Sequence, residues 1–258
     1  MRWQTSRAPG RGLTLFVRRV SEPTAPPVLL LHGLGVSGSV FQAFARRLLP
    51  DWAAVAPDLR GHGQSDAPPS GYSPDDYAAD LVELIQADLQ PPPVPVVGHS
   101  LGALVGMSLA AMRPELVRWL VLLDPPLDPN RGDGEVSQVY RLRHAPAGEL
   151  EAYLLERNPR GGELLAQALA RDFRQASDLA FETMLAAPAY RPVSLEVPTL
   201  VLQADPTHGG VLGDAAAAQA AEALGDARVV KIAGSTHAMH ASHPEEVARA
   251  IREFASEV

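Results

Sequence analysis

Ser100 lies between two glycines in the segment Gly98-His99-Ser100-Leu101-Gly102. Residues 94–97 before it are apolar and predict a strand, whereas residues 101–112 predict a helix. A serine in such a strand–turn–helix is held with its hydroxyl exposed, and the turn is so tight that only small residues fit at positions 98 and 102. The N-terminus of the helix also favours negative charge that develops beside it. The spacing therefore predicts a nucleophilic serine at position 100.

A serine hydroxyl is too weakly acidic to attack a substrate unaided, so it needs a neighbouring base. His237 is our candidate, because it follows the last apolar run in a Gly-Ser-Thr-His loop with room for a mobile imidazole. His240 and His243 are its rivals, although either could instead be a surface or helix-capping histidine. His99, inside the turn, is expected to pack behind the serine.

The elements that must position these side chains alternate between strands and helices. Apolar runs predict strands at residues 13–20, 28–31, 53–57, 94–97, 117–123, 198–203 and 227–232. Residues 35–50 predict a turn and a helix, and further helices are predicted at residues 74–89, 101–112, 215–224 and 244–255, with Ser73 capping the helix at 74–89. Near-continuous apolar strands that alternate with helices predict a parallel sheet covered on both faces. The carboxyl ends of the strands then meet at one edge, where the polar candidates lie.

Residues 126–193 interrupt this alternation, because they contain no convincing strand. Four helical stretches are predicted there, at residues 135–143, 148–157, 161–173 and 176–185. We expect residues 1–125 and 194–258 to form the core domain, and residues 126–193 to form a helical cap over the pocket. The apolar cap residues make an apolar acyl group a plausible ligand, although packing between cap helices accounts for most of them: Leu142, Tyr153, Leu154, Phe173, Phe181 and Met184.

Composition excludes several classes of function. The 258 residues carry 22 Lys and Arg against 30 Asp and Glu, a formal net charge of −8 that argues against nucleic acid or an anionic membrane as the main partner. The chain has no cysteine, so disulfides and thiol catalysis are excluded. We find no secretory signal and no apolar stretch long enough to cross a bilayer, and therefore expect a cytoplasmic protein. The sequence leaves the oligomeric state open.

Four motifs, in this order along the chain, resemble the α/β-hydrolase superfamily. They are Leu31-His32-Gly33-Leu34-Gly35, Asp58-Leu59-Arg60-Gly61-His62-Gly63-Gln64-Ser65, the segment around Ser100, and Gly234-Ser235-Thr236-His237. The resemblance covers nearly the whole chain. It implies an α/β fold with a mostly parallel eight-stranded sheet flanked by helices, and a helical cap inserted after the sixth strand. It does not fix a substrate, because this superfamily hosts many chemistries.

The resemblance also implies a role for each site residue. His237 matches the histidine that takes the serine proton and later delivers it to the leaving group. The family most often places the acid after the seventh strand, three residues beyond a glycine; here Ala204 replaces that glycine, and Thr207 stands where the acid should be. Asp205 remains a candidate, but a minority of the family places the acid after the sixth strand, where Asp124 lies. We take Asp124 as the acid and Asp205 as its rival.

Charge on the carbonyl oxygen in the transition state needs at least two donors. The backbone N–H groups of Leu34 and Leu101 fit this oxyanion hole by resemblance. His32 is expected to support its loop by hydrogen bonding, and Asp58, Arg60 and His62 are expected to form an internally hydrogen-bonded turn. A metal site of Asp205, His208 and His237 matches no compact zinc motif, so we expect neither metal nor cofactor.

These features together predict a serine hydrolase that cleaves a carboxylic ester, with a lactone or thioester as variants, through an acyl-enzyme. The expected partner is a small-molecule ester with an apolar acyl group. Hydrolysis of a carbon–carbon bond and perhydrolysis would use the same three residues. A prolyl-type peptidase would need an acidic cap residue to hold an amine, and the sequence favours none of the five candidates: Glu135, Glu149, Glu151, Glu156 and Glu163. The remaining alternative is a binding protein that has the pocket but no turnover.

Overall fold

One sheet of eight strands organises the computed structural model, which describes residues 2–20, 24–89, 91–128, 134–157, 161–187, 190, 192–225 and 227–258. The strands lie in the order β1-β2-β4-β3-β5-β6-β7-β8, and all pairs are parallel except β1 with β2 and β2 with β4. Their bounds are β1 Trp3–Gly10, β2 Leu13–Val20, β3 Pro27–Leu31, β4 Ala53–Pro57, β5 Val94–His99, β6 Val117–Leu123, β7 Thr199–Ala204 and β8 Arg228–Ile232.

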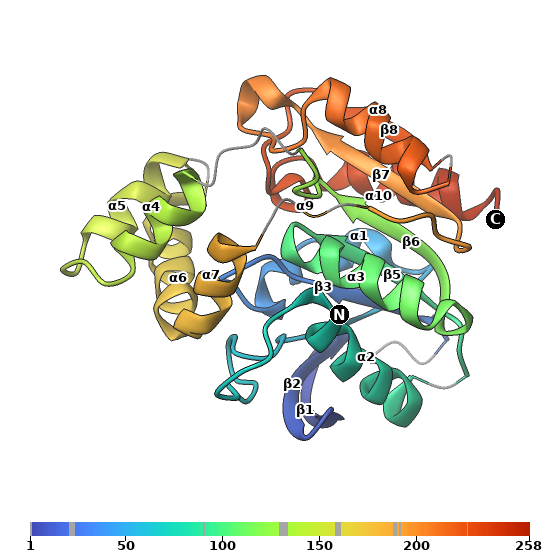
Figure 1. Ribbon diagram of the computed structural model, residues 1–258, viewed down its shortest axis with the longest axis horizontal. Coiled ribbons are helices and arrows are strands. Elements are labelled where there is room, and N and C mark those ends of the chain that lie inside the picture. The colour runs from blue at the N-terminus through green and yellow to red at the C-terminus, as the bar shows by residue number, and fades with distance from the viewer. Residues whose placement is uncertain are drawn as a thin grey trace.

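Helices cover both faces of this sheet, as the continuous apolar strands require. The apolar side chains of α2 (Pro74–Asp88), α3 (Leu101–Met112) and α8 (Asp214–Ala223) pack on one face. Those of α1 (Ala45–Leu48), α9 (Met239–Ser242) and α10 (Pro244–Ala255) pack on the other. The helices α2, α3 and α8 lie in front of the strands in Figure 1. The predicted α/β architecture with a mostly parallel eight-stranded sheet is confirmed.

The sequence prediction misses β1, and it expects one helix after the turn in residues 35–50 where the structure has two short ones. β1 pairs with β2 along its whole length, but most of its side chains are exposed, so no apolar pattern marks it. Residues 35–50 form a 3₁₀ helix, Gly38–Phe41, and the short α1 instead of one helix. The backbone N–H of Gly38 donates to the Asp58 carboxylate, so the first turn is fixed to the end of β4.

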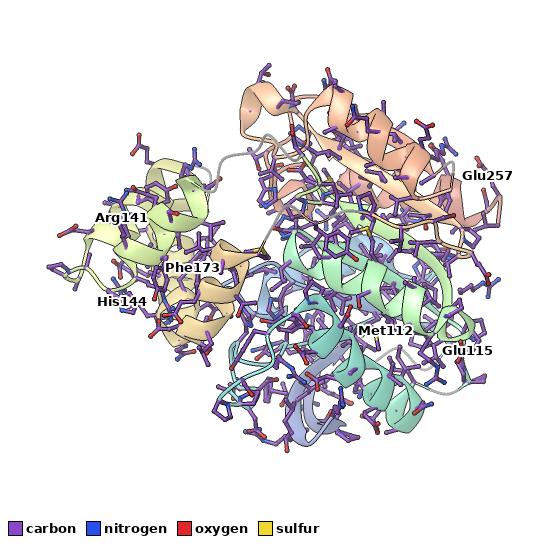
Figure 2. The ribbon with its side chains drawn as sticks, in the orientation of Figure 1. Met112, Glu115, Arg141, His144, Phe173 and Glu257 are labelled. Carbon is purple, nitrogen blue, oxygen red and sulfur yellow. The ribbon has the colours of Figure 1, made fainter. Side chains whose placement is uncertain are left out.

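Four helices lie between β6 and β7 in the order of the chain: α4 (Gly134–Leu142), α5 (Glu149–Arg157), α6 (Gly162–Gln175) and α7 (Asp178–Ala186). They enclose an apolar cluster of their own and stand to the left of the sheet in Figure 1. In Figure 2, Phe173 lies on the side of these helices that faces the sheet, whereas Arg141 and His144 lie on the far side. The division into core domain and cap stays a prediction.

Two contacts join these helices to the loop after β3. A Cβ added at Gly35, whose φ is +77°, would lie 2.3 Å from the Phe173 ring. The Ser37 hydroxyl donates to the Asp172 carboxylate over 2.7 Å, and burial raises the pKa of that carboxyl. The α6 helix is therefore fixed to the same loop that contains Leu34.

The turn between β5 and α3 leaves no room for side chains at its two glycines. A Cβ added at Gly98 would lie 2.2 Å from the Gly102 carbonyl oxygen, and one added at Gly102 would lie 2.2 Å from that of Leu31. Ser100, between them, has φ +53° and ψ −113°, a conformation that non-glycine residues rarely adopt. Its backbone N–H donates to Leu123 of β6, which helps to hold this conformation.

We expect Gly102→Ala to lower the free energy of unfolding by about 3 kcal/mol, because the added methyl group must displace the β3 backbone. Urea unfolding followed by circular dichroism measures the change. Gly134→Ala is the matched control: a Cβ there meets nothing within 4 Å, so its unfolding midpoint should stay close to that of the wild type. Equal midpoints for both variants would contradict the packing described here.

Candidate active site

His237 and Asp124 form a hydrogen-bonded pair at the carboxyl edge of the sheet. His237 Nδ1 lies 2.6 Å from Asp124 Oδ2, and Asp124 is fully buried at the end of β6. A carboxylate can only accept, so Nδ1 is the donor and, in the neutral ring, Nε2 is left with a free lone pair. This arrangement gives the imidazole the tautomer that a general base requires.

Three backbone amides, one from the last residue of β7 and two from the loop after it, surround the Asp124 carboxylate. Val211 donates to Oδ2 over 2.8 Å, and Ala204 and Leu212 each donate to Oδ1 over 3.3 Å. Asp124 itself has φ +44°, and its side chain contacts His237 in the loop after β8. The contacts compensate the cost of burying a carboxylate and fix its orientation.

Asp205, the rival acid, does not contact His237. Its Oδ1 accepts from both the N–H and the hydroxyl of Thr207, and its Oδ2 accepts from the N–H of Gly234. These bonds lower the pKa of its carboxyl well below the usual range, with the Gly234 amide as the largest cause. Asp205 thus caps the short helix Pro206–His208 and joins the loop after β7 to the loop after β8.

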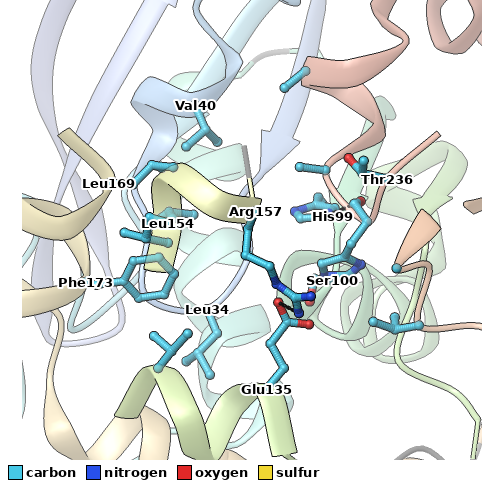
Figure 3. Close-up of a pocket in the computed structure, with 18 of the residues that line it drawn as sticks. Leu34, Val40, His99, Ser100, Glu135, Leu154, Arg157, Leu169, Phe173 and Thr236 are labelled. Carbon is cyan, nitrogen blue, oxygen red and sulfur yellow. Dashed lines mark hydrogen bonds and ion pairs between the residues drawn. The ribbon is translucent and has the colours of Figure 1, made fainter. Parts of the chain in front are cut away.

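Ser100 and His237 line the same cavity, which has a volume of about 290 Å³. The Ser100 hydroxyl makes no hydrogen bond to any residue that the structure describes, so it is available to a ligand. Much of the wall is apolar (Figure 3), with Leu34, Val40, Leu154, Leu169, Phe173 and Phe181 among its residues. Of the cap residues singled out in the sequence, Leu142 and Met184 pack into the apolar clusters instead.

The loop after β3 approaches Ser100 closely. A Cβ added at Gly33 would lie 3.4 Å from the Cβ of Ser100. The N–H of the next residue, Leu34, therefore belongs to a loop that lies against the serine. Within the described ranges, neither the N–H of Leu34 nor that of Leu101 has an acceptor. Two unpartnered amides beside one hydroxyl are the arrangement that an oxyanion hole needs.

Two buried histidines stand beside His237. The ring centroids of His99 and His237 are 4.6 Å apart, and His99 Nε2 lies 3.0 Å from the His237 carbonyl oxygen, to which it donates. Burial lowers the pKa of His99 well below its usual range, and that of His240 to about 3. Both rings are therefore neutral. His240 packs on Phe41, and His99 donates to the His237 carbonyl oxygen. Neither ring therefore replaces His237 as the partner of Asp124.

His243 is also separate from the Asp124 pair, because it precedes α10 and its Nδ1 contacts the Ser242 hydroxyl. His32 supports its loop as predicted: Nδ1 donates to the Gly33 carbonyl, and Nε2 accepts from the N–H of Leu59. Burial lowers the pKa of His32 to about 4, so this ring is neutral too.

The loop that begins at Asp58 is bonded internally, as predicted: the N–H of Gln64 donates to the Asp58 carboxylate, and His62 Nδ1 donates to the Arg60 carbonyl. It also makes bonds that the sequence did not predict. Asp58 pairs with Arg18 of β2, and Arg60 makes two bonds of 2.7 Å to Asp80 of α2. The turn therefore joins the sheet to α2, away from the cavity.

Sequence reasoning did not find the role of Arg157 in the cavity wall. Arg157 lines the cavity together with Glu135, and their side chains form an ion pair of 2.7 Å. The sequence suggests only one role for Glu135, the binding of a substrate amine. The described ranges contain no group of three His, Asp or Glu side chains arranged to hold a metal ion, and no helix in them is long and apolar enough to span a membrane.

The chain belongs to the alpha/beta hydrolase family, whose model matches residues 28–250. It is 30% identical, over 94% of its length and 91% of the relative's, to 2-(acetamidomethylene)succinate hydrolase of Mesorhizobium japonicum. A crystal structure of E-2-(acetamidomethylene)succinate hydrolase matches 99% of the chain and 100% of its own, with a TM-score of 0.81 and 27% identity. An esterase structure from Exiguobacterium antarcticum matches with a TM-score of 0.80, 20% identity and coverage of 98% and 100%, which shows the common fold.

Asp205→Asn should make the stability of the protein less dependent on pH. The folded state lowers the pKa of Asp205, so its carboxylate stabilises the fold above the unfolded pKa of about 3.9, and this contribution is lost as the pH falls below that value. We expect the variant to unfold at lower urea concentration than the wild type at pH 7, with the difference shrinking as the pH falls from about 4 towards about 2. A difference that stays constant over this range would contradict the assigned bonds.

Proposed function

We propose that this protein is a serine hydrolase that cleaves a carboxylic ester through an acyl-enzyme, with Ser100 as nucleophile, His237 as general base and Asp124 as the acid that orients it. The 2.6 Å bond from His237 to the buried Asp124, in the cavity that Ser100 lines, carries the proposal. It leaves Nε2 of His237 free to take a proton, which is the requirement for activating the serine hydroxyl.

In the proposed first half-reaction, Ser100 Oγ attacks the ester carbonyl while His237 Nε2 takes the hydroxyl proton. The imidazolium is stabilised by Asp124, which stays ionised. The N–H groups of Leu34 and Leu101 donate to the oxyanion of the tetrahedral intermediate. His237 then gives its proton to the leaving alkoxide oxygen, and the acyl group remains on Ser100. In the second half-reaction, water gives a proton to His237 and attacks the acyl carbon. The bond from the acyl carbon to Ser100 Oγ then breaks, Oγ takes the proton back from His237, and the acid is released.

The lining residues support an ester with a small apolar acyl group, because leucine and phenylalanine side chains cover much of the wall. The relative from Mesorhizobium japonicum is, by its name, a hydrolase of a succinate derivative, which supports a small-molecule substrate for this chain. A prolyl-type peptidase is less well supported, since the cap carboxylate of Glu135 is already paired with Arg157.

Hydrolysis of short p-nitrophenyl esters tests the proposal. We expect Ser100→Ala to lower kcat/KM at least about a thousandfold, and Asp124→Asn to lower it about a hundredfold or more, because the histidine loses its tautomer and its counter-ion. Asp205→Asn should keep wild-type turnover at 25 °C, since its bonds lie outside the proposed triad.

The proposed function fails if folded wild-type protein hydrolyses these esters no faster than Ser100→Ala and does not react with a fluorophosphonate. Fluorophosphonate labelling of Ser100 without turnover would point to a specialised substrate. Activity that disappears in Asp205→Asn but survives in Asp124→Asn would assign the acid to the loop after β7.

His99 is a positioning residue in this scheme, because its Nε2–H fixes the main chain of the catalytic histidine. We expect His99→Leu to lower kcat about 10- to 100-fold with little change in KM, since a small displacement of the base disrupts the reacting geometry. His99→Gln should recover part of that loss by supplying an N–H donor. A His99→Leu variant with the kcat of the wild type and a similar melting temperature would disprove this role.

A further inference from the structure

An ion pair crosses the cavity that Ser100 lines. Arg157, the last residue of α5, places Nη2 at 2.7 Å from Oε1 of Glu135 in the first turn of α4. Figure 3 shows the guanidinium and the carboxylate meeting inside the cavity. Their side chains are 47% and 43% exposed, so both remain accessible to a molecule that enters the cavity.

Arg157 is the only arginine or lysine among the described residues that line this cavity. Its guanidinium stands 5.6 Å from the centroid of the Tyr153 ring, a cation–π contact that helps to hold the charged group in place. A guanidinium has five N–H donors, and the contacts with Glu135 and with the Tyr153 hydroxyl leave others available. A planar donor set of this kind matches the two oxygens of a carboxylate.

The partner of Arg157 can be exchanged. A half-exposed ion pair contributes little to stability, because water solvates both groups when they separate. A carboxylate that enters the cavity can take the position of Glu135 and restore the same interaction, while the Glu135 side chain turns to solvent. An apolar ligand gains nothing from this exchange, so the pair distinguishes substrates by charge.

We propose that Arg157 is the binding site for a carboxylate at the far end of the acyl group, and that Glu135 is a competing anion which occupies this site in the empty enzyme. The preferred substrates are then half-esters of aliphatic diacids, whose methylene chain packs on the apolar wall and whose free carboxylate meets Arg157. This inference rests on the proposed function, since it names the substrate class of the same site.

Matched esters test the inference. The monomethyl esters of the straight-chain diacids from succinic to adipic acid are each compared with the methyl alkanoate of the same chain length, and monomethyl adipate also with methyl 6-aminohexanoate. Release of acid is followed in a pH-stat. The quantity of interest is the ratio of kcat/KM for the half-ester to kcat/KM for the uncharged ester, because the ratio cancels effects on the reacting groups.

We expect Arg157→Gln to lower this ratio about tenfold for the best half-ester, because the carboxylate loses its charged donor. Glu135→Gln should raise the ratio, since the competing anion is removed and the donors of Arg157 are free. Any effect of either variant on the hydrolysis of the uncharged methyl alkanoates also acts on the half-esters and therefore cancels in the ratio. Circular dichroism melting confirms that each variant is folded.

Binding of the diacid itself separates this inference from the proposed function. Isothermal titration should show adipate binding more tightly than hexanoate to the wild type and to Glu135→Gln, and losing that preference in Arg157→Gln, whether or not any ester is hydrolysed. An unchanged preference in Arg157→Gln overturns the inference. So does faster hydrolysis of the amino ester than of the half-ester, which would make Glu135 the receptor for a cation.

Discussion

The close approach of α3 to β3 is the constraint on which the rest of the site depends. Gly98 and Gly102 allow the backbone to turn directly from β5 into α3, so Ser100 must adopt its positive φ. A strained residue of this kind costs about 1–3 kcal/mol and persists only where the surrounding structure enforces it. Here the enforcement comes from β5, which is paired on both sides, with β3 and with β6. The strain is thus supported by the centre of the sheet, where the backbone has least freedom to relax.

The same sheet explains how a carboxylate that follows β6 meets a histidine that follows β8. The strands β6, β7 and β8 are neighbours, so their carboxyl ends bring Asp124, the amides after β7 and the histidine loop into one place. The loop after β7 donates backbone hydrogen bonds to the Asp124 carboxylate. It does not supply the carboxylate that His237 contacts. Thr207, at the position where the family usually has its acid, instead donates to Asp205. Thr207 therefore departs from the family pattern because the loop after β7 orients the carboxylate of Asp124 instead of providing a carboxylate of its own to His237.

Much of the fold could be predicted because parallel strands buried on both faces leave long apolar runs in the sequence. The strand β1 has no such apolar run, because most of its side chains are exposed. Its pairing with β2 depends on backbone hydrogen bonds, which produce no pattern in the sequence. Residues 35–50 predict a turn and a single helix because their apolar spacing is helical. Their real course is set by contacts with β4 and Asp58, which lie outside any local pattern.

The site shows the same limit more sharply. Ser100, His237 and Asp124 each follow a recognisable strand, so topology alone brings them to one edge. The relation between Arg157 and Glu135 has no local signal: the two residues belong to different helices, and they become neighbours only because α4 and α5 pack together. The sheet and its loops position Ser100, His237 and Asp124, so the chemistry can be inferred from the core motifs. The inserted helices supply most of the cavity's apolar wall and its ion pair. Selectivity depends on helix packing that no motif records.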